Sequence, residues 1–172
     1  MAEDRRSLLK VITATLGAGA AGSVGGPILG TVIGPASKTT VVGAHGFVPV
    51  GAFASLPSDG SPVALDVVVE RPKDAWTLMP PTRVGAVYAA RSGAGVTVFS
   101  TSCPHLGCRV ELGRGEARFA CPCHESSFGA DGRVLEGPAP RGLDPLEARV
   151  VDGRVEVRFL RFRSGTPERI VV

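Results

Sequence analysis

The longest apolar pattern of the chain lies near its N-terminus, where residues 11–37 include no charged side chain. At about 1.5 Å per helical residue this stretch would span roughly 40 Å, more than the roughly 30 Å hydrocarbon core of a bilayer. The pattern predicts a membrane-anchoring helix within residues 1–36. A cleaved export signal is the alternative, since Ala18, Gly19 and Ala20 match a small-residue cleavage site. Because apolar residues continue well past that site, a retained anchor is favoured.

The charges that flank this stretch predict its orientation. Arg5, Arg6 and Lys10 precede the apolar residues, whereas Lys38 stands alone after them. Basic residues collect on the cytoplasmic side of membrane helices, so the N-terminus is expected in the cytoplasm and the bulk of the protein outside. The pair Arg5-Arg6 also resembles a twin-arginine export signal, the route of proteins that fold and load a cofactor before they cross.

The rest of the chain carries the pattern of a β protein. Residues 37–46 are small and polar and predict a flexible tether. In residues 47–172, which form the expected head domain, β-branched runs alternate with turn residues, and they predict strands at 63–70, 83–90, 96–100, 117–120, 148–151 and 154–159. Asp152-Gly153 favours a two-residue hairpin turn, which needs positive φ at both positions. The expected fold is mainly β, an N-terminal transmembrane helix followed by a small antiparallel β-sandwich, with a subdomain of about residues 100–142 inserted as loops.

Composition and charge narrow the functional classes. The chain has 172 residues, enough for one ordinary domain besides the anchor and the tether. Its net charge is +3, its 19 basic residues form no run, and only 5% of its residues are aromatic. Nucleic-acid binding is therefore not expected, because it needs basic residues clustered on one face.

All four cysteines and two of the three histidines fall in two short boxes, CPHLGC at 103–108 and CPCHESSF at 121–128. Two disulfides would suit an exported protein, but they leave the histidines unexplained. A structural zinc site fits the ligand types, although each box mixes cysteine with histidine and two cysteines would be left over. A cluster of two irons, with two thiolate and two imidazole ligands beside one disulfide, accounts for all six residues.

These boxes resemble the signature of the Rieske iron–sulfur proteins, C-x-H-x-G-C followed by C-P-C-H-x-S. Residues 137–141, Gly-Pro-Ala-Pro-Arg, resemble the proline loop of that family, which covers the third side of the cluster. The resemblance implies a [2Fe-2S] cluster whose inner iron is bound by Cys103 and Cys121 and whose outer iron is bound by His105 and His124. It also implies a disulfide between Cys108 and Cys123, and Ser126 keeps a hydroxyl of the family pattern.

The anchor, tether and β-rich head together resemble the Rieske subunit of bacterial cytochrome bc complexes. That resemblance implies a redox subunit of a quinol:cytochrome c oxidoreductase in the bacterial cytoplasmic membrane, with the head on the periplasmic side. Its partners would be cytochrome b and c-type cytochrome subunits. It would take one electron and a proton from quinol and pass the electron to a c-type haem. The residue expected to hydrogen-bond the quinol hydroxyl is His124, with His105 as the second candidate. The small Rieske subunit of an exported molybdenum oxidoreductase of the arsenite oxidase type is the alternative.

The chain departs from the commonest family pattern at three positions. Pro104 stands where threonine is usual, Glu125 where glycine is usual, and Phe128 where many members have a tyrosine that donates a hydrogen bond to a cluster-binding cysteine. Fewer donors to sulfur stabilise the reduced cluster less and lower its potential. A lower potential suits menaquinol, which is more reducing than ubiquinol. The simpler interpretation of Phe128 is an aromatic ring packed under the loop, and this is compatible with an effect on the potential.

Overall fold

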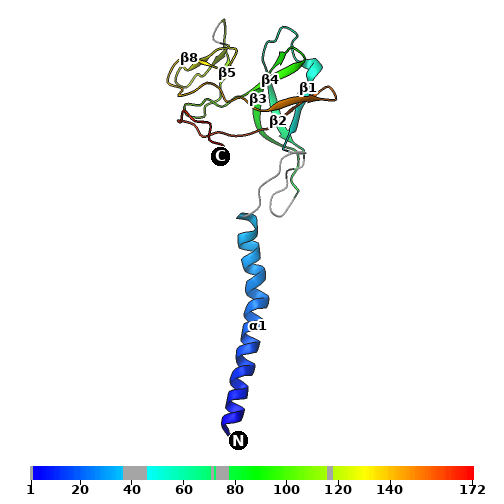
Figure 1. Ribbon diagram of the computed structural model, residues 1–172, viewed down its shortest axis with the longest axis vertical. Helices are drawn as coiled ribbons and strands as arrows, with labels where there is room; N and C mark the ends of the chain where they lie inside the picture. The colour runs from blue at the N-terminus through cyan, green and yellow to red at the C-terminus, as the bar shows by residue number, and fades with distance from the viewer. Residues whose placement is uncertain (1, 37–45, 71, 73–77, 116–117) are drawn as a thin grey trace. The chain divides into compact units, whose positions relative to one another are not determined.

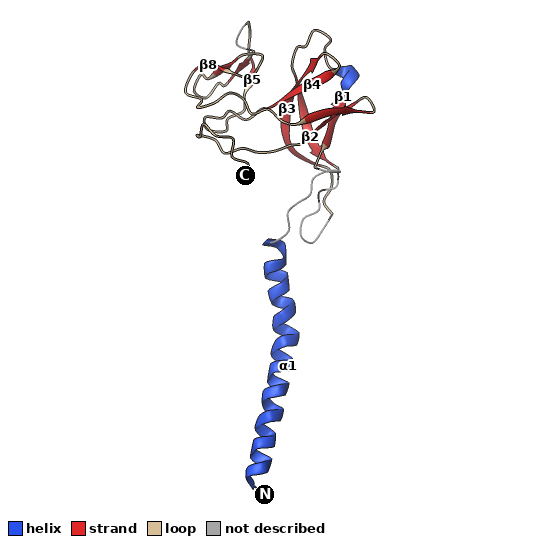
Figure 2. Cartoon of the chain, viewed as in Figure 1, coloured by secondary structure: helices blue, strands red, loops and turns tan. Residues whose placement is uncertain are grey.

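The computed structural model describes residues 2–36, 46–70, 72, 78–115 and 118–172. The chain divides into two compact units, of which the first contains the N-terminal helix and the second contains the β strands. Figures 1 and 2 show the helix and the strands of these units. The predicted tether falls almost entirely on residues 37–45, which lie outside the described residues.

Helix α1 (Ala2–Ala36) is the N-terminal element. Its segment Asp4–Leu29 is long and apolar enough to cross a membrane. The described apolar side chains along it are exposed, among them Leu8, Leu16 and Leu29. The hydroxyls of Thr13, Thr15, Ser23 and Thr31 bond to carbonyls of the same helix, so they need no outside partner in an apolar environment. The helix has the properties of a membrane span that the sequence predicted.

Two three-stranded antiparallel sheets form the base of the second unit. One sheet has the order β2-β3-β4 and the other β1-β10-β9. Their strands are β1 (Val48–Ala52), β2 (Val63–Val69), β3 (Thr82–Ser92), β4 (Gly95–Ser100), β9 (Ala148–Val151) and β10 (Arg154–Val157). The predicted hairpin is confirmed: Val151 pairs with Arg154, and Asp152 and Gly153 have φ of 49° and 72°.

The core of this base comes from the alternation that identified the strands. In β10 the residues run exposed, buried, half-buried, buried, so that Val155 and Val157 point inward. Val67, Val87 and Val98 from the other sheet are also almost fully buried in the same core. Each buried valine contributes about 1.5–3 kcal/mol relative to an exposed one. Strand β1 lies against β2 and β4 against β9, so the two sheets close over this core.

The segment that contains the cysteines forms a third sheet, of which the sequence pattern indicated only the strand at 117–120, overlapping the observed β6. Its order is β5-β6-β7-β8, with β5 (Glu111–Leu112), β6 (Phe119–Ala120), β7 (Ser127–Phe128) and β8 (Val134–Glu136). A second core lies beside it, formed by Tyr88, Phe99, Val110, Phe119, Phe128 and Leu143 together with Cys103 and Cys121. The cysteine boxes are therefore mounted on a small packed sheet, and loops connect its short strands (Figure 2).

Candidate metal centre

The first cysteine box forms a closed loop between β4 and β5, here called the first ligand loop (103–108). The Cys103 N–H donates to the Cys108 carbonyl at 2.8 Å, and the Gly107 N–H donates to the Cys103 carbonyl at 2.9 Å. Gly107 has φ of 78°, a conformation that glycine adopts without steric cost. These bonds bring the two cysteines together at the base of the loop and leave His105 and Leu106 in the turn between them.

The second box forms a similar loop between β6 and β7, here called the second ligand loop (121–126). The Cys121 N–H donates to the Ser126 carbonyl at 2.7 Å and closes it. Glu125 has φ of 58°, which is unusual for a residue with a side chain. Glycine is the usual residue of the family pattern at this position, and the positive φ explains why glycine is preferred there.

The structure brings together the residues that the two boxes contribute. Cys108 and Cys123 form a disulfide across the two loops, 15 residues apart in sequence. Cys103 and Cys121 remain thiols and are 1% and 3% exposed. The Cys121 sulfur lies within 4.8 Å of both disulfide sulfurs. The interpretation with two disulfides is therefore wrong, because two of the four cysteines stay reduced.

The two histidines also lie side by side. The ring centroids of His105 and His124 are 4.7 Å apart, and the rings are nearly perpendicular. His105 is half-buried and His124 is exposed. Nδ1 of His105 and Oγ of Ser126 are buried, and neither has a hydrogen-bond partner among the described residues. Buried polar atoms without partners are rare in native proteins, so these two atoms point to a group that binds between the loops.

The electrostatics of the thiols favour the same interpretation. Burial is the largest influence on the Cys103 thiol and raises its pKa; the His105 backbone N–H lowers it in part, and the neighbouring Cys121 raises it again. The Cys103 thiol therefore does not ionise readily, because its thiolate would lose its hydration in this buried position. A bound cation reverses that balance, since it stabilises thiolates and displaces their protons. The donor set of two buried sulfurs and two imidazoles fits an iron–sulfur cluster with mixed ligands.

The proline loop (137–141) contacts the second ligand loop. Gly137 has φ of 94°, and a Cβ at this residue would lie 2.5 Å from the Ser126 Cα. Glycine is therefore required for the backbones to come this close. Beside them lies an open depression of about 580 Å³, lined by residues that include His124, Glu125, Glu136 and Pro138. The exposed imidazole thus stands at the edge of a hollow with two carboxylates on its wall.

Comparison with known sequences identifies the family. The family profile described as Rieske [2Fe-2S] domain matches residues 47–148. The chain belongs to the Rieske [2Fe-2S] domain family. Its cofactor is accordingly a [2Fe-2S] cluster, which agrees with the buried cysteine pair and with the two atoms that lack partners.

Curated relatives of this Rieske protein include iron–sulfur subunits of cytochrome b6-f complexes. The subunit of Synechococcus sp. (strain JA-3-3Ab) is 53% identical over 57 residues, which cover 33% of this chain and 32% of the relative. That of Chlorobaculum tepidum is 34% identical over 71 residues, 41% of this chain and 39% of the relative. The chain thus spans between about a third and two fifths of the length of these relatives. Among solved structures, the plasma membrane Rieske protein of Synechocystis PCC 6803 is 28% identical, with a TM-score of 0.47, over 65% of this chain and 99% of that one.

One part of the site leaves no sign in the sequence. Residues 163–166, near the C-terminus, contact the first ligand loop, and Arg141 bonds to their carbonyls. Arg141 was recognised only as the last residue of the proline loop. Since these contacts join irregular segments more than 20 residues apart, no periodic pattern in the sequence reports them.

Proposed function

We propose that this chain is the electron-transfer subunit of a membrane cytochrome complex of the bc or b6-f type, with Cys103, His105, Cys121 and His124 as the ligands of its cluster. The arrangement of buried sulfurs and paired imidazoles supports the ligand set. The relatives named as cytochrome b6-f subunits support the assignment to a complex of this type. When bound, the cluster supplies a site that accepts and donates one electron at a time, at a potential raised by its neutral imidazole ligands.

The role proposed for each side chain follows from how deeply it is buried. Cys103 and Cys121, both buried, would hold the inner iron, and the disulfide between Cys108 and Cys123 keeps the two ligand loops together. Nδ1 of His105 is the buried nitrogen and is the atom proposed to face the outer iron. That orientation leaves Nε2 for a hydrogen bond outside the site.

His124 is proposed as the residue that meets the quinol. It is the more exposed imidazole, and it borders the depression beside the proline loop. Its free ring nitrogen can accept a hydrogen bond from the quinol hydroxyl and take up the proton as the electron leaves. The buried ring of Phe128 offers no hydroxyl to a cluster sulfur, which lowers the potential and favours menaquinol as the substrate.

The same proposal places the chain in the membrane. Among the described residues helix α1 is the one candidate span, with Arg5 and Arg6 at its cytoplasmic end and the head on the periplasmic side of a bacterial inner membrane. Residues 37–46 are proposed as the tether that lets the head move between a cytochrome b and a c-type haem. If alkaline carbonate extracts the native protein from membranes, the anchor is not retained, and the alternative of an exported molybdenum oxidoreductase is favoured.

Metal analysis of the purified full-length protein tests the cluster. Iron and labile sulfide should be present in equal amounts, and reduction should produce an electron paramagnetic signal of the Rieske kind. His124→Gln should abolish that signal, whereas His45→Gln, at the third histidine and outside both boxes, should keep it. Stoichiometric zinc without sulfide would overturn the proposed function. Co-purification with haem and the rates with menaquinol and ubiquinol then test the complex and the substrate.

A further inference from the structure

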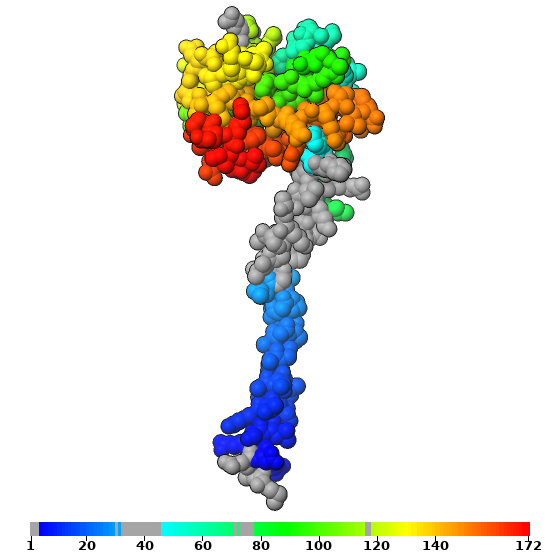
Figure 3. Space-filling model, viewed as in Figure 1, coloured from blue at the N-terminus to red at the C-terminus, as the bar shows by residue number. Residues whose placement is uncertain are grey.

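A segment near the C-terminus, residues 163–166, lies against the first ligand loop and is called the C-terminal clasp here. The Gly165 N–H donates to the Pro104 carbonyl at 2.8 Å. Pro104 stands between Cys103 and His105, the proposed ligands of the two irons. Gly165 has φ of 76°, and a Cβ there would be 3.6 Å from the His105 carbonyl. The clasp therefore bonds to the backbone between the two ligand residues and lies close to the His105 carbonyl. Figure 3 shows the C-terminal residues, in red, against the yellow part of the head.

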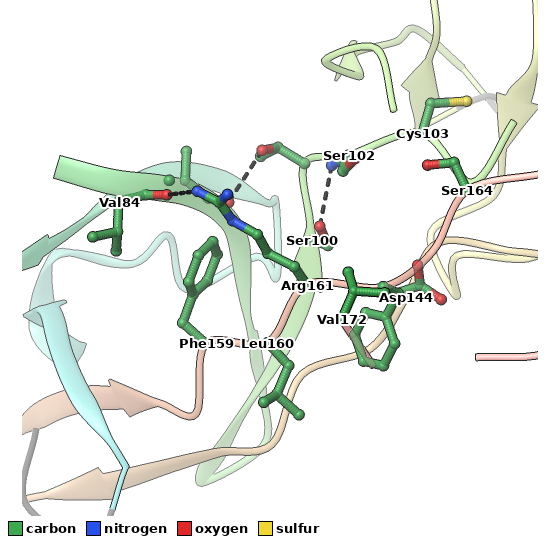
Figure 4. Close-up of a pocket in the computed structure, with 14 residues that line it drawn as sticks. Val84, Ser100, Ser102, Cys103, Asp144, Phe159, Leu160, Arg161, Ser164 and Val172 are labelled. Atoms are coloured by element: carbon green, nitrogen blue, oxygen red, sulfur yellow. Dashed lines mark hydrogen bonds between the residues drawn. The ribbon is translucent and has the colours of Figure 1, made fainter. Parts of the chain in front are cut away.

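The clasp also forms part of the wall of a cavity beside Cys103. This cavity has a volume of about 340 Å³, and Cys103, Ser164 and Arg161 are among the residues that line it. Figure 4 shows Ser164 next to Cys103 and Arg161 bonded to the Val84 carbonyl on the opposite side. Displacement of the clasp would open this side of Cys103 to water.

Arg141 holds the clasp in place. Its guanidinium donates to the Thr166 carbonyl and, at 3.0 Å, to the Arg163 carbonyl. It also forms two 2.8 Å bonds to the two carboxylate oxygens of Asp144. Arg141 and Asp144 are only 9% and 3% exposed, and the bonds to Asp144 raise the pKa of Arg141. One buried side chain thus joins the end of the proline loop to the C-terminal segment.

Only arginine suits this arrangement. The planar guanidinium presents five N–H donors in a fixed fork, and here it bonds a carboxylate bidentately and two carbonyls besides. Lysine keeps the charge, but its ammonium is a point donor on a flexible stem and cannot reproduce that fork. A substitution by lysine therefore removes the geometry while it preserves the charge near the cluster.

We propose that Arg141 is a positioning residue, which holds the C-terminal clasp on the Pro104 carbonyl and so fixes the backbone between Cys103 and His105 and excludes water from the inner side of the site. The inference rests on the proposed ligand set. It does not require that the partner complex or the quinol be known.

The test compares Arg141→Lys with Arg158→Lys in the full-length, cluster-loaded protein. Arg158 is the matched control, because it lies upstream of the clasp, where its exposed side chain pairs with Glu147 at 3.4 Å. Arg141→Lys should speed hydrogen exchange of the Gly165 amide at least tenfold and broaden the paramagnetic signal. Water at the inner side stabilises the more negative reduced cluster, so the reduction equilibrium should shift at least threefold toward it, about 28 mV for one electron. Arg158→Lys should change none of the three.

Three outcomes would overturn the inference: unchanged exchange at Gly165, faster exchange with an unchanged potential and signal, or equal effects of the two lysine variants. If Arg141→Lys fails to fold, Gly165→Ala decides, because its Cβ strains the clasp without touching the buried ion pair. Gly153→Ala, at φ of 72° and with no atom within 4 Å, is its control. An unmodified protein without iron and sulfide would refute the proposed function, which separates that failure from a failure of the clasp.

Discussion

Gly137→Ala should separate the proline loop from the second ligand loop. The added Cβ would lie 2.5 Å from the Ser126 Cα and 2.9 Å from the Ser126 nitrogen. Carbon atoms in contact prefer about 3.5–4.0 Å, so the two backbones would have to move apart by about 1 Å. Both contacts are to backbone, which cannot rotate away as a flexible side chain could. Since the Ser126 carbonyl closes the loop of Cys121, the movement should reach a ligand.

The loss of stability can be estimated from two contributions. Gly137 has φ of 94°, and an L-residue in the left-handed region costs about 1–2 kcal/mol. Forcing an extra methyl group into a packed site costs about 1–3 kcal/mol more. The sum, about 2–5 kcal/mol, is a large part of the roughly 5–15 kcal/mol that stabilises an ordinary domain. Gly153→Ala isolates the first contribution, because its φ is 72° and nothing lies within 4 Å.

Urea unfolding of both variants in detergent, followed by pulse proteolysis, measures the free energies of unfolding, and the visible absorbance of the cluster reports its retention. Gly137→Ala should lose at least 1 kcal/mol more than Gly153→Ala, the lower limit of the overpacking contribution, and should release the cluster faster. Equal losses in the two variants, with equal retention of the cluster, would refute the reasoning. The proline loop would then not brace the second ligand loop.

Three further predictions concern the loops themselves. Cys108→Ser should lower cluster retention or potential more than it destabilises the sheets, because it frees the Cys123 thiol within 4.8 Å of the Cys121 sulfur. A thiol titration of the unmodified protein that finds Cys108 and Cys123 both free would contradict this. Phe128→Tyr should raise the potential by about 40–90 mV in film voltammetry, since one hydrogen bond to sulfur stabilises the reduced cluster by about 1–2 kcal/mol; an unchanged or lower value would mean that the ring only packs. Glu125→Gly, at φ of 58°, should leave the midpoint of thermal unfolding unchanged or raise it. The relief of about 1–2 kcal/mol of backbone strain exceeds or balances the roughly 0.5–1 kcal/mol entropic cost of glycine. A lower midpoint would show that the Glu125 side chain stabilises the loop.

The main strands could be predicted from sequence because their burial alternates with period two. The predicted range 148–151 coincides with β9, and the ranges for β2, β3 and β4 differ from the observed strands by at most two residues at either end. Strand β1 was missed, since its sequence Val-Pro-Val-Gly-Ala contains two residues that argue against a strand. It is an edge strand with a register shift between Pro49 and Gly51, where proline and glycine are tolerated.

Of the short strands in the cysteine segment, only β6 was predicted, by the range 117–120, and the others could not have been found in this way. Strands β5 and β7 have two residues each, which is too few for any period to show. Their stability comes from the burial of Phe119 of β6 and Phe128 of β7 in the second core, which is a tertiary property. The two cysteine boxes could be recognised in the sequence because cysteine and histidine are rare and their spacing follows from the loop geometry. The structure then showed which cysteines pair and which stay reduced.

The ligand loops depend on support from two directions, and the sequence shows only one of them. Each loop is closed by a backbone bond at its cysteine, and the disulfide joins the two. The proline loop packs on the second loop at Gly137, whereas the C-terminal clasp bonds the first loop at Pro104. Arg141 ends the proline loop and anchors the clasp, so the same residue connects both supports. Contacts that share a residue are not energetically independent. A change in either support should therefore alter the positions of the proposed ligands in both ligand loops. The position of the cluster is thus set by chain segments that contribute no ligand.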